Sequence, residues 1–369
     1  MNFEFSEEQN MLRDQARSFL ADKCSLKNVR EILDGDAPFD ADAWRGMAEL
    51  GWTGTAIPEE YGGIGMGYLA LCVIAEELGR SLAPTPFSSS VYLFAEAILA
   101  AGSEEQKKQY LPGIATGTSI GTLAVFEGPQ APSQNNIKTN AADGILNGTK
   151  MPVPDGDVAD YSVVAANSGK GTSLYIVDLS EDTVAAENIR TLDPTRSHAK
   201  ITLSDAPGEL LGEEGEGWNI LGQVLNSAAV LFAFEQVGGA QATLDMGKEY
   251  AMTRFAFGRP IATFQAIKHK LADMYIATEL ARSNCYYGAW ALDTNSTELP
   301  IAAATCRVSA TDAYHESSKE NIQIHGGMGF TWEFDCHLYY RRSKLLAVNL
   351  GGEPRWKDML ISRLEQASA

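Results

Sequence analysis

The chain has 369 residues, 45% of them hydrophobic, and a formal net charge of −19 at pH 7. One hydrophobic core rarely organises so long a chain, so we expect two or three structural units. The acidic balance, 48 Asp and Glu against 29 Lys and Arg, argues against nucleic acid and anionic membrane surfaces as partners. Local positive side chains must therefore hold any phosphate-bearing ligand.

The cysteines and the N-terminus indicate the compartment. The 5 Cys are widely spaced and form no CxxC pair, which is typical of buried thiols in a reduced intracellular protein. The acidic N-terminus lacks the apolar segment of a signal peptide, and no uncharged run reaches transmembrane length. We therefore expect a cytoplasmic protein without a membrane partner. The spacing of His and Cys predicts no metal site.

The order of local patterns predicts a mostly α fold with a central all-β domain. Residues 1–120 are predicted to form helices, with capping boxes at residues 6–9 and 103–106. From 121 to 213, clustered turn residues separate short alternating runs, which favour a barrel or sandwich. Helices return over residues 214–369.

The segment 225–265 is the centre of this last domain. Its first part is apolar almost without a break and predicts a buried helix. We expect the helix to end near 255–258, with Gly258 in the left-handed C-cap conformation and Pro260 unable to continue it. Arg254 and Arg259 follow there. Two interpretations are open: a clamp on a phosphate, or two solvated arginines at a helix C-terminus.

Three motifs carry a resemblance to a known family. Residues 250–265, YAMTRFAFGRPIATFQ, resemble the Y-A-x-x-R-x-x-F-G-x-P-I…Q signature of acyl-CoA dehydrogenases. Residues 323–330, QIHGGMGF, are similar to that family's Q-x-x-G-G-x-G-[YF] segment, and residues 56–63, AIPEEYGG, resemble its IPEEYGG loop. Because all three occur in the family's order, the chain is identified as a member. The resemblance implies a helical domain, a β-barrel and a four-helix bundle.

The resemblance also implies chemistry. Such enzymes bind FAD, take an acyl-CoA substrate and pass electrons to an electron-transfer flavoprotein. A Glu carboxylate removes the α-proton of the thioester and a hydride passes from the β-carbon to the flavin.

In this family each FAD also reaches into a neighbouring subunit. The Arg charge suits the pyrophosphate, glycines let backbone N–H groups approach it, and amides meet polar edges. The matching residues here are Arg254, Phe257, Gln265, Gln323, Gly326 and Gly327. His325, beside the glycine turn, is a further candidate for contact with the cofactor.

The other half of the family's site matches poorly. Phe126 stands where a hydroxyl that meets the flavin ring is expected. After Lys150, residues 151–154 (MPVP) replace an aromatic residue and a hydroxyl. On the central helix, the family's Asp and Arg near the CoA fall on Asn226 and Ala229, and an alternative base position falls on Ala228.

The catalytic base is also displaced. The family's usual Glu aligns with Gly351, and Glu353 lies two residues later. Glu353 is either a relocated base or a solvated turn carboxylate. Glu235, in the apolar helical run, is either a base with a raised pKa or the partner of an Arg or Lys in the bundle.

The pattern of losses predicts a divided site. The retained residues serve a neighbour's FAD, whereas the lost ones serve the chain's own flavin, base and CoA. The prediction is a subunit of a heterotetrameric acyl-CoA dehydrogenase whose paralogous partner supplies the base, in the style of enzymes for bulky, steroid-like thioesters. The alternatives are a self-sufficient homodimer or homotetramer that uses Glu353 or Glu235, and a non-catalytic scaffold subunit.

Overall fold

The computed structural model describes residues 6–368, which fall into two compact units. Of the described residues, the first unit combines 6–30, 68–83 and 229–368, and the second combines 31–67 and 84–228. The predicted division at residues 120 and 213 stays a prediction. The helix α2 (Leu26–Asp34) lies where the chain passes from the first unit to the second.

Short helices make up the first part of the second unit. They are α3 (Ala41–Glu49), η1 (Trp52–Gly54), η2 (Glu59–Tyr61), η3 (Ser88–Ala95), α5 (Glu96–Ala101) and α6 (Glu104–Ala115). The predicted capping box before α6 is confirmed, because the Ser103 hydroxyl accepts from Gln106 N and the Gln106 side chain accepts from Ser103 N.

A sheet of eight strands completes the second unit and confirms the predicted all-β region. Its strands are β1 (Gly121–Ala124), β2 (Asn140–Ala142), β3 (Ile145–Pro154), β4 (Tyr161–Asn167), β5 (Thr172–Asp178), β6 (Val184–Asn188), β7 (His198–Pro207) and β8 (Glu209–Leu211). The order is β6-β7-β3-β2-β4-β5-β8, and β1 pairs with β4 in parallel. One face buries a core that includes Leu146, Val164 and Ile201.

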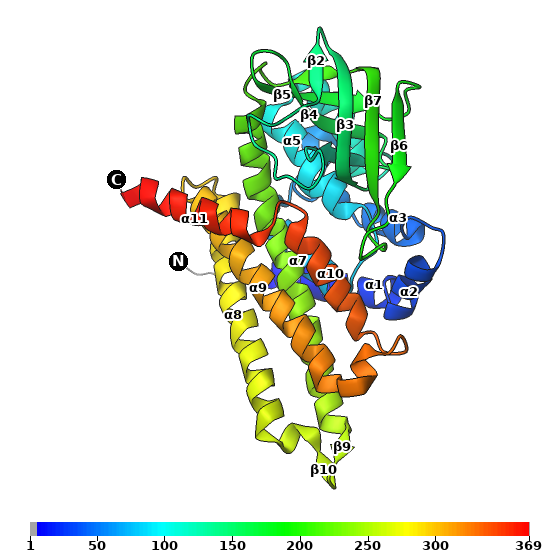
Figure 1. Ribbon diagram of the computed structural model, residues 1–369, viewed down its shortest axis with the longest axis vertical. Helices are drawn as coiled ribbons and strands as arrows, with labels where there is room; N and C mark the ends of the chain where they lie inside the picture. Colours follow the sequence, from blue (N-terminus) through cyan, green and yellow to red (C-terminus); the bar gives the residue numbers. More distant parts are fainter. Residues whose placement is uncertain (1–5, 369) are drawn as a thin grey trace. The chain divides into compact units, whose positions relative to one another are not determined.

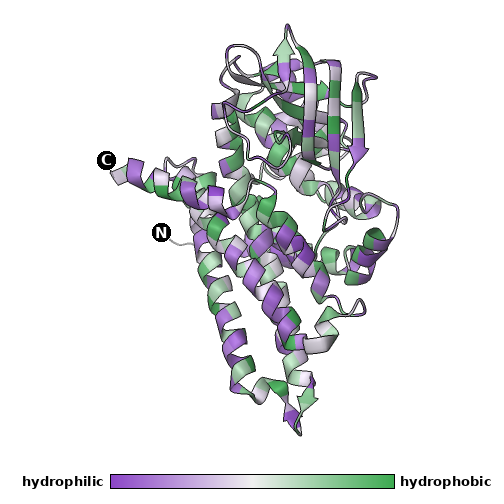
Figure 2. Cartoon of the chain, in the orientation of Figure 1, coloured by the Kyte–Doolittle hydropathy of each residue, from purple (hydrophilic) through white to green (hydrophobic). Residues whose placement is uncertain are grey.

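Long helices dominate the first unit (Figure 1). They are α1 (Glu7–Lys23), α4 (Gly67–Arg80), α7 (Gly217–Thr253, which enters this unit at residue 229), α8 (Gln265–Asp293), α9 (Leu299–His325), α10 (Cys336–Val348) and α11 (Glu353–Ser368). Hydrophobic and hydrophilic residues alternate along α8 and α9, as expected of helices with one buried face (Figure 2). The capping box at Ser6 is also confirmed.

The helix α7 differs from its predicted bounds at both ends. It begins at Gly217, ahead of residue 225, and it ends at Thr253. Gly258 is not its C-cap. It has φ 78° in the turn between the short strands β9 (Phe255–Ala256) and β10 (Arg259–Pro260). The same left-handed preference of glycine serves a hairpin turn as well as a helix end, and the local pattern does not distinguish them.

The helices α4 and α7 approach each other closely. A Cβ on Gly79 would lie 1.9 Å from the carbonyl oxygen of Glu235, and a Cβ on Gly238 would lie 1.9 Å from that of Glu76. Only glycine allows this backbone contact. It holds Glu76 and Glu77 of α4 at the centre of the unit.

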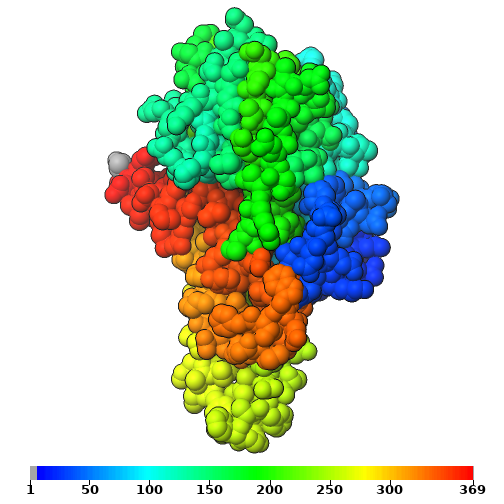
Figure 3. Space-filling view, turned by 45° about the vertical axis from the view of Figure 1, so that its right-hand side comes forward, coloured from blue at the N-terminus to red at the C-terminus, as the bar shows by residue number. Residues whose placement is uncertain are grey.

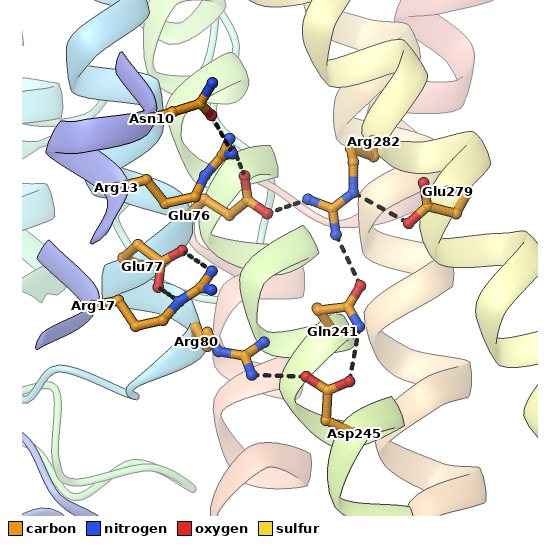
Figure 4. A network of polar contacts seen from close by, with 10 residues as sticks. All are labelled: Asn10, Arg13, Arg17, Glu76, Glu77, Arg80, Gln241, Asp245, Glu279 and Arg282. Carbon is orange, nitrogen blue, oxygen red and sulfur yellow. Dashed lines mark hydrogen bonds and ion pairs between the residues drawn. The ribbon is translucent and has the colours of Figure 1, made fainter. Parts of the chain in front are cut away.

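These two carboxylates belong to a polar network that links α1, α4, α7 and α8 (Figure 4). Arg17 of α1 contacts Glu77 at 2.7 Å, and Glu76 bonds to Arg282 of α8. Arg282 also donates to Gln241, which donates in turn to Asp245 of α7. The buried charges are thus paired, as stability requires.

By length and composition α7 would be able to cross a membrane, with a mean hydropathy of 1.4 over its most apolar window. In this structure 78% of that window is buried inside the protein, as in the core helix of a folded domain.

Candidate functional site

The hairpin that follows α7 has an exposed aromatic residue, Phe257, in its turn. Its strands pair Arg259 with Ala256 and Pro260 with Phe255, which leaves Phe257 and Gly258 as a two-residue turn. Both turn residues have positive φ, 51° and 78°, as a type I′ turn requires. Positive φ is rare for a bulky residue, and the Phe257 side chain is also 95% exposed. A strained, exposed aromatic residue is typical of a binding site.

The hairpin is supported by aromatic contacts at the start of α8. The ring of Phe264 lies 6.2 Å from that of Phe257 in an edge-on arrangement. The guanidinium of Arg259 lies 4.2 Å from the centre of the Phe264 ring, a cation–π contact. Arg259 is therefore engaged within the hairpin and orients Phe264.

Arg254, Gln265 and Gln323 form a second group of exposed side chains. Arg254 is anchored by its backbone, since its N–H donates to Tyr250 O and its carbonyl accepts from Ile261 N. Within residues 6–368, these three side chains have no hydrogen-bond or ion-pair partner. They offer one guanidinium and two amides to a ligand.

The paired glycines follow α9. Gly326 has φ 59° and ψ −136°, a conformation open essentially only to glycine. A Cβ on Gly326 or Gly327 would meet no atom within 4 Å, so packing does not require glycine at either position. Bare backbone facing open space is what an anion needs to approach N–H groups.

The hairpin and the glycine turn rest on the same hydrophobic cluster. Ala251 near the end of α7, Met274 of α8 and Ile324 near the end of α9 are buried in it, and Ile261 packs against it. His325 is buried beside this cluster, its Nδ1 2.8 Å from Asn321 O. We call the surface made by Arg254, Phe257, Gln265, Gln323, Gly326 and Gly327 the anion corner. In Figure 3 the yellow-green segment that carries the hairpin stands uncovered.

Glu353 is the first residue of α11. It is paired with Lys357, and its side chain is 34% exposed. Burial, followed by the charge of Glu353, raises the pKa of the neighbouring Asp312. Gly351, at the family's base position, has φ 92° and is buried, so an acidic residue there would be strained.

Glu235 is fully buried in α7. Burial lowers the pKa of Arg307 to about 10, and the nearby charge of Glu235 acts in the opposite direction. Arg307 also donates to the Gln236 side chain at 2.7 Å. This environment, an acidic group beside a buried guanidinium, fits the predicted bundle partner.

In the second unit, the segments expected to meet the chain's own flavin pair with each other. Met151 N donates to Phe126 O and Gly128 N donates to Met151 O, each at 2.8 Å. Next to them, Glu127 accepts from buried Lys150 at 2.7 Å. Burial lowers the pKa of Lys150 to about 8, against the effect of Glu127. Neither the ring of Phe126 nor any side chain of residues 151–154 offers a hydrogen-bond donor to a flavin.

A cavity near Gln323 was not predicted. It has a volume of about 400 Å³ and is lined by Phe330, Trp332, His337 and Arg341, among others. The available signal was the run of aromatic and basic residues directly after the glycine motif. In the part of the chain from 6 to 368, no three His, Cys, Asp or Glu residues gather as metal ligands.

Comparison with known proteins shows the family to which the chain belongs. The family models "Acyl-CoA dehydrogenase, N-terminal domain" and "Acyl-CoA dehydrogenase, C-terminal domain" match residues 6–118 and 215–354. The chain is 34% identical over 338 residues to the acyl-CoA dehydrogenase IpdE2 of Mycobacterium tuberculosis, covering 91% of each chain.

Two solved structures are similar throughout. The first, described as a Tcur3481-Tcur3483 steroid ACAD variant, has a TM-score of 0.90 at 30% identity and covers 98% of this chain and 99% of its own. The second, the ChsE4-ChsE5 complex from Mycobacterium tuberculosis, has a TM-score of 0.90 at 28% identity and covers 99% of each chain. The motifs, the fold and these similarities together place the chain in the acyl-CoA dehydrogenase family, whose members are FAD-dependent oxidoreductases acting on the CH–CH bond of acyl-CoA thioesters.

Proposed function

We propose that this chain is one subunit of a hetero-oligomeric acyl-CoA dehydrogenase, in which its anion corner holds part of an FAD whose flavin end lies in a paralogous partner. The observation that carries the proposal is the contrast between two regions. The anion corner keeps every matching residue, with Phe257 95% exposed and the Arg254 side chain without a partner in residues 6–368. The region for the chain's own flavin lacks the hydroxyl group expected at Phe126, and residues 151–154 lack the expected aromatic residue and hydroxyl.

FAD fits the anion corner by chemistry. Arg254 supplies a permanent positive charge for a pyrophosphate, which the net charge of −19 makes necessary. The open backbone at Gly326 and Gly327 allows N–H groups to approach the same phosphates. Gln265 and Gln323 can donate and accept at ribose or adenine edges. When bound, FAD supplies the acceptor for the substrate's hydride.

The catalytic base then belongs to the partner. Gly351 provides no carboxylate, Glu353 is held by Lys357, and Glu235 lies beside Arg307. In this proposal the partner's carboxylate takes the α-proton, and this chain positions the cofactor. The similarity to a structure described as a steroid ACAD and to a complex of two differently named chains supports a bulky, steroid-like acyl-CoA as substrate and a heterotetramer as the assembly.

Compartment and electron acceptor complete the proposal. All 5 Cys are free and buried, which suits a reducing cytoplasm. The acceptor is an electron-transfer flavoprotein, as the family resemblance implies.

The test is to purify the chain alone and together with any paralogue that co-purifies, and to read flavin absorbance. We expect little flavin in the lone chain and flavin in the complex. Arg254→Ala should lower the flavin content of the complex, whereas Arg45→Ala, at an exposed arginine of α3, should not. Stoichiometric FAD and acyl-CoA turnover in the lone chain would instead support the homo-oligomer. If Arg254→Ala leaves the flavin content of the complex unchanged, the chain would instead be a non-catalytic scaffold subunit.

A further inference from the structure

The turn between α10 and α11 carries an arginine side chain where the family resemblance places a carboxylate. Gly351 aligns with the family's usual Glu, and it is buried with φ 92°. A Cβ at Gly351 would lie 3.0 Å from Cδ and 3.5 Å from Nη1 of Arg355, the third residue of α11. The side chain of Arg355 therefore covers the position of the family's base.

The backbone around this arginine is firmly held. The indole Nε1 of Trp356 donates to Leu350 O at 3.2 Å, and Trp356 is 1% exposed. Arg355 N donates to Gly352 O at 3.1 Å. These residues all belong to the first unit, so the contact between Arg355 and the turn lies within one compact body.

The guanidinium of Arg355 has no hydrogen-bond or ion-pair partner within residues 6–368. Burial alone lowers the pKa of Arg355, whereas Glu76 raises the pKa of Arg282 despite burial. A charge that is partly removed from water without a counterion is costly. None of the Arg355 nitrogen atoms belongs to the fully buried unpaired atoms of the described chain, so a ligand in solution can reach the guanidinium.

The charged neighbours of Arg355 supply no counterion. Glu353, two residues earlier, is paired with Lys357. Arg363 adds a second positive charge, because burial and then the charge of Arg355 lower the pKa of Arg363. The Nη1 of Arg363 already donates to Pro300 O at 2.5 Å. Arg355 is therefore the group at this turn that has donors left for an anion.

We propose that Arg355 and the turn at Gly351 form a binding site for a carboxylate group carried by a small molecule. A guanidinium edge offers two parallel N–H donors that match the two oxygens of a carboxylate. One partly buried positive charge balances one negative charge, which favours a carboxylate over a doubly charged phosphate. The turn then accepts a carboxylate from a ligand instead of supplying one. Binding there goes beyond the proposed function, because it requires neither FAD nor a partner chain.

The first experiment is an NMR titration of the full chain, with isotope-labelled arginine, against sodium propionate at constant ionic strength. Arg355→Gln removes one Nε–H signal and so identifies it. We expect propionate to shift that signal saturably, whereas propionamide, its uncharged analogue, leaves it in place. The Nε–H signal of Arg45, an exposed arginine of α3 identified in the same way, should not move with either compound.

The second experiment supplies the carboxylate from the chain itself. Gly351→Glu and Gly351→Gln share the strain of φ 92° and have nearly the same shape, so they differ mainly in charge. Near pH 7 we expect the ratio of folded to unfolded chain to be about tenfold higher for Gly351→Glu, because its carboxylate bonds to Arg355. Adding Arg355→Gln to each variant should abolish that difference. Urea denaturation of the four variants measures it.

Two CoA thioesters of equal chain length identify the source of the carboxylate. Suppose that calorimetry shows adipoyl-CoA binding at least about tenfold more tightly than hexanoyl-CoA, and that Arg355→Gln removes this preference. The carboxylate is then the free end of an acyl-CoA. If the two thioesters bind equally while propionate still shifts the Arg355 signal, the ligand is a free carboxylic acid.

The proposal is overturned if propionate leaves the Arg355 signal in place, or if propionamide shifts it equally. It is also overturned if Gly351→Glu and Gly351→Gln are equally stable, or if their difference persists after Arg355→Gln. The proposed function fails on another result, the flavin content of the Arg254→Ala complex, so the two outcomes are distinguishable.

Discussion

The rings of Tyr250 and His325 stack with centres 4.0 Å apart and an angle of 24°. Tyr250 lies in the last turn of α7, and His325 is the last residue of α9. Phe334 contacts both rings edge-on, at 6.1 Å and 5.8 Å. This contact joins the last turn of α7, which leads into the hairpin, to the residue before the glycine turn. It therefore fixes the two halves of the anion corner relative to each other.

Tyr250→Leu should loosen that junction. The substitution keeps apolar volume but removes the ring stack, and we expect a loss of about 0.5–1.5 kcal/mol in the free energy of unfolding. The flavin content of the complex should fall as well. Tyr250→Phe is the matched control, because it keeps the ring. Urea denaturation and flavin absorbance measure the two effects, and equal flavin content in both variants would contradict the role given to the stack.

Gly327→Ala should separate cofactor binding from folding. A Cβ at this position meets no atom within 4 Å, so the stability of the lone chain should change by less than about 0.5 kcal/mol. The same methyl group would obstruct close approach of a pyrophosphate, so the flavin content of the complex should drop.

Gly329→Ala is the contrasting variant. Its Cβ would lie 2.5 Å from the carbonyl oxygen of Ile322, so the lone chain itself should be destabilised. Thermal melts of both lone variants and flavin absorbance of both complexes provide the comparison. A Gly327→Ala complex with full flavin content would remove Gly327 from the anion corner.

The local motifs of this chain were predictable, whereas its long-range pairs were not. The capping box at Ser103 depends on residues three apart, and the structure confirms it. Arg30 and Asp335 form an ion pair at 2.6 Å although 305 residues separate them. No local sequence pattern indicates such a pair, because its geometry depends on how distant helices pack against each other.

The residues of the anion corner were chosen for a different reason. They occupy short motifs whose order is typical of a family, so a resemblance named them without any packing argument, and their contact with FAD stays a prediction. The hairpin turn at Phe257 was missed, because a Phe with positive φ contradicts its intrinsic preference. Local rules fail most often at functional or strained positions, and Phe257 is strained.

Acid should destabilise the chain through its buried histidines. Burial lowers the pKa of His198, and its Nδ1 lies 3.1 Å from Arg196 O. Below the unfolded-state pKa of about 6.5, the unfolded chain binds a proton that the folded chain does not. The free energy of unfolding should therefore fall as the pH drops below that value, until the folded-state pKa is passed.

His198→Asn tests this dependence. Asn keeps a donor for the Arg196 carbonyl but does not titrate, so its unfolding free energy should fall less steeply with pH. Burial also lowers the pKa values of His315, His325 and His337, so the slope should decrease without vanishing. Urea denaturation at a series of acidic pH values measures this slope. Identical slopes in both proteins would show that His198 does not contribute.

Arg282 and Glu76 should be strongly coupled (Figure 4). Glu76 is 5% exposed, and it bonds to Arg282 while Arg13 lies 4.0 Å away. Despite burial, Glu76 raises the pKa of Arg282. Arg282→Met should cost about 3–5 kcal/mol, because it leaves a buried carboxylate poorly paired.

The double variant Arg282→Met with Glu76→Gln should recover much of that loss, since no buried charge remains. A double-mutant cycle in urea measures the coupling. Additive effects of the two substitutions would show that Arg282 and Glu76 are not coupled to each other and that their ion pair does not hold α4 against α8.

Glu353→Gln and Glu235→Gln locate the base. If the partner supplies it, Glu353→Gln should leave turnover of the complex unchanged within about twofold, since it removes only a surface ion pair with Lys357. Glu235→Gln keeps the shape of a fully buried side chain, so any effect should appear first in stability, through the neighbouring Arg307. The turnover of each variant complex is measured and divided by its flavin content. A loss of turnover of about a hundredfold or more, with FAD retained, would assign the base to this chain. The divided site would then be limited to the cofactor, because proton abstraction and the anion corner would reside in the same subunit.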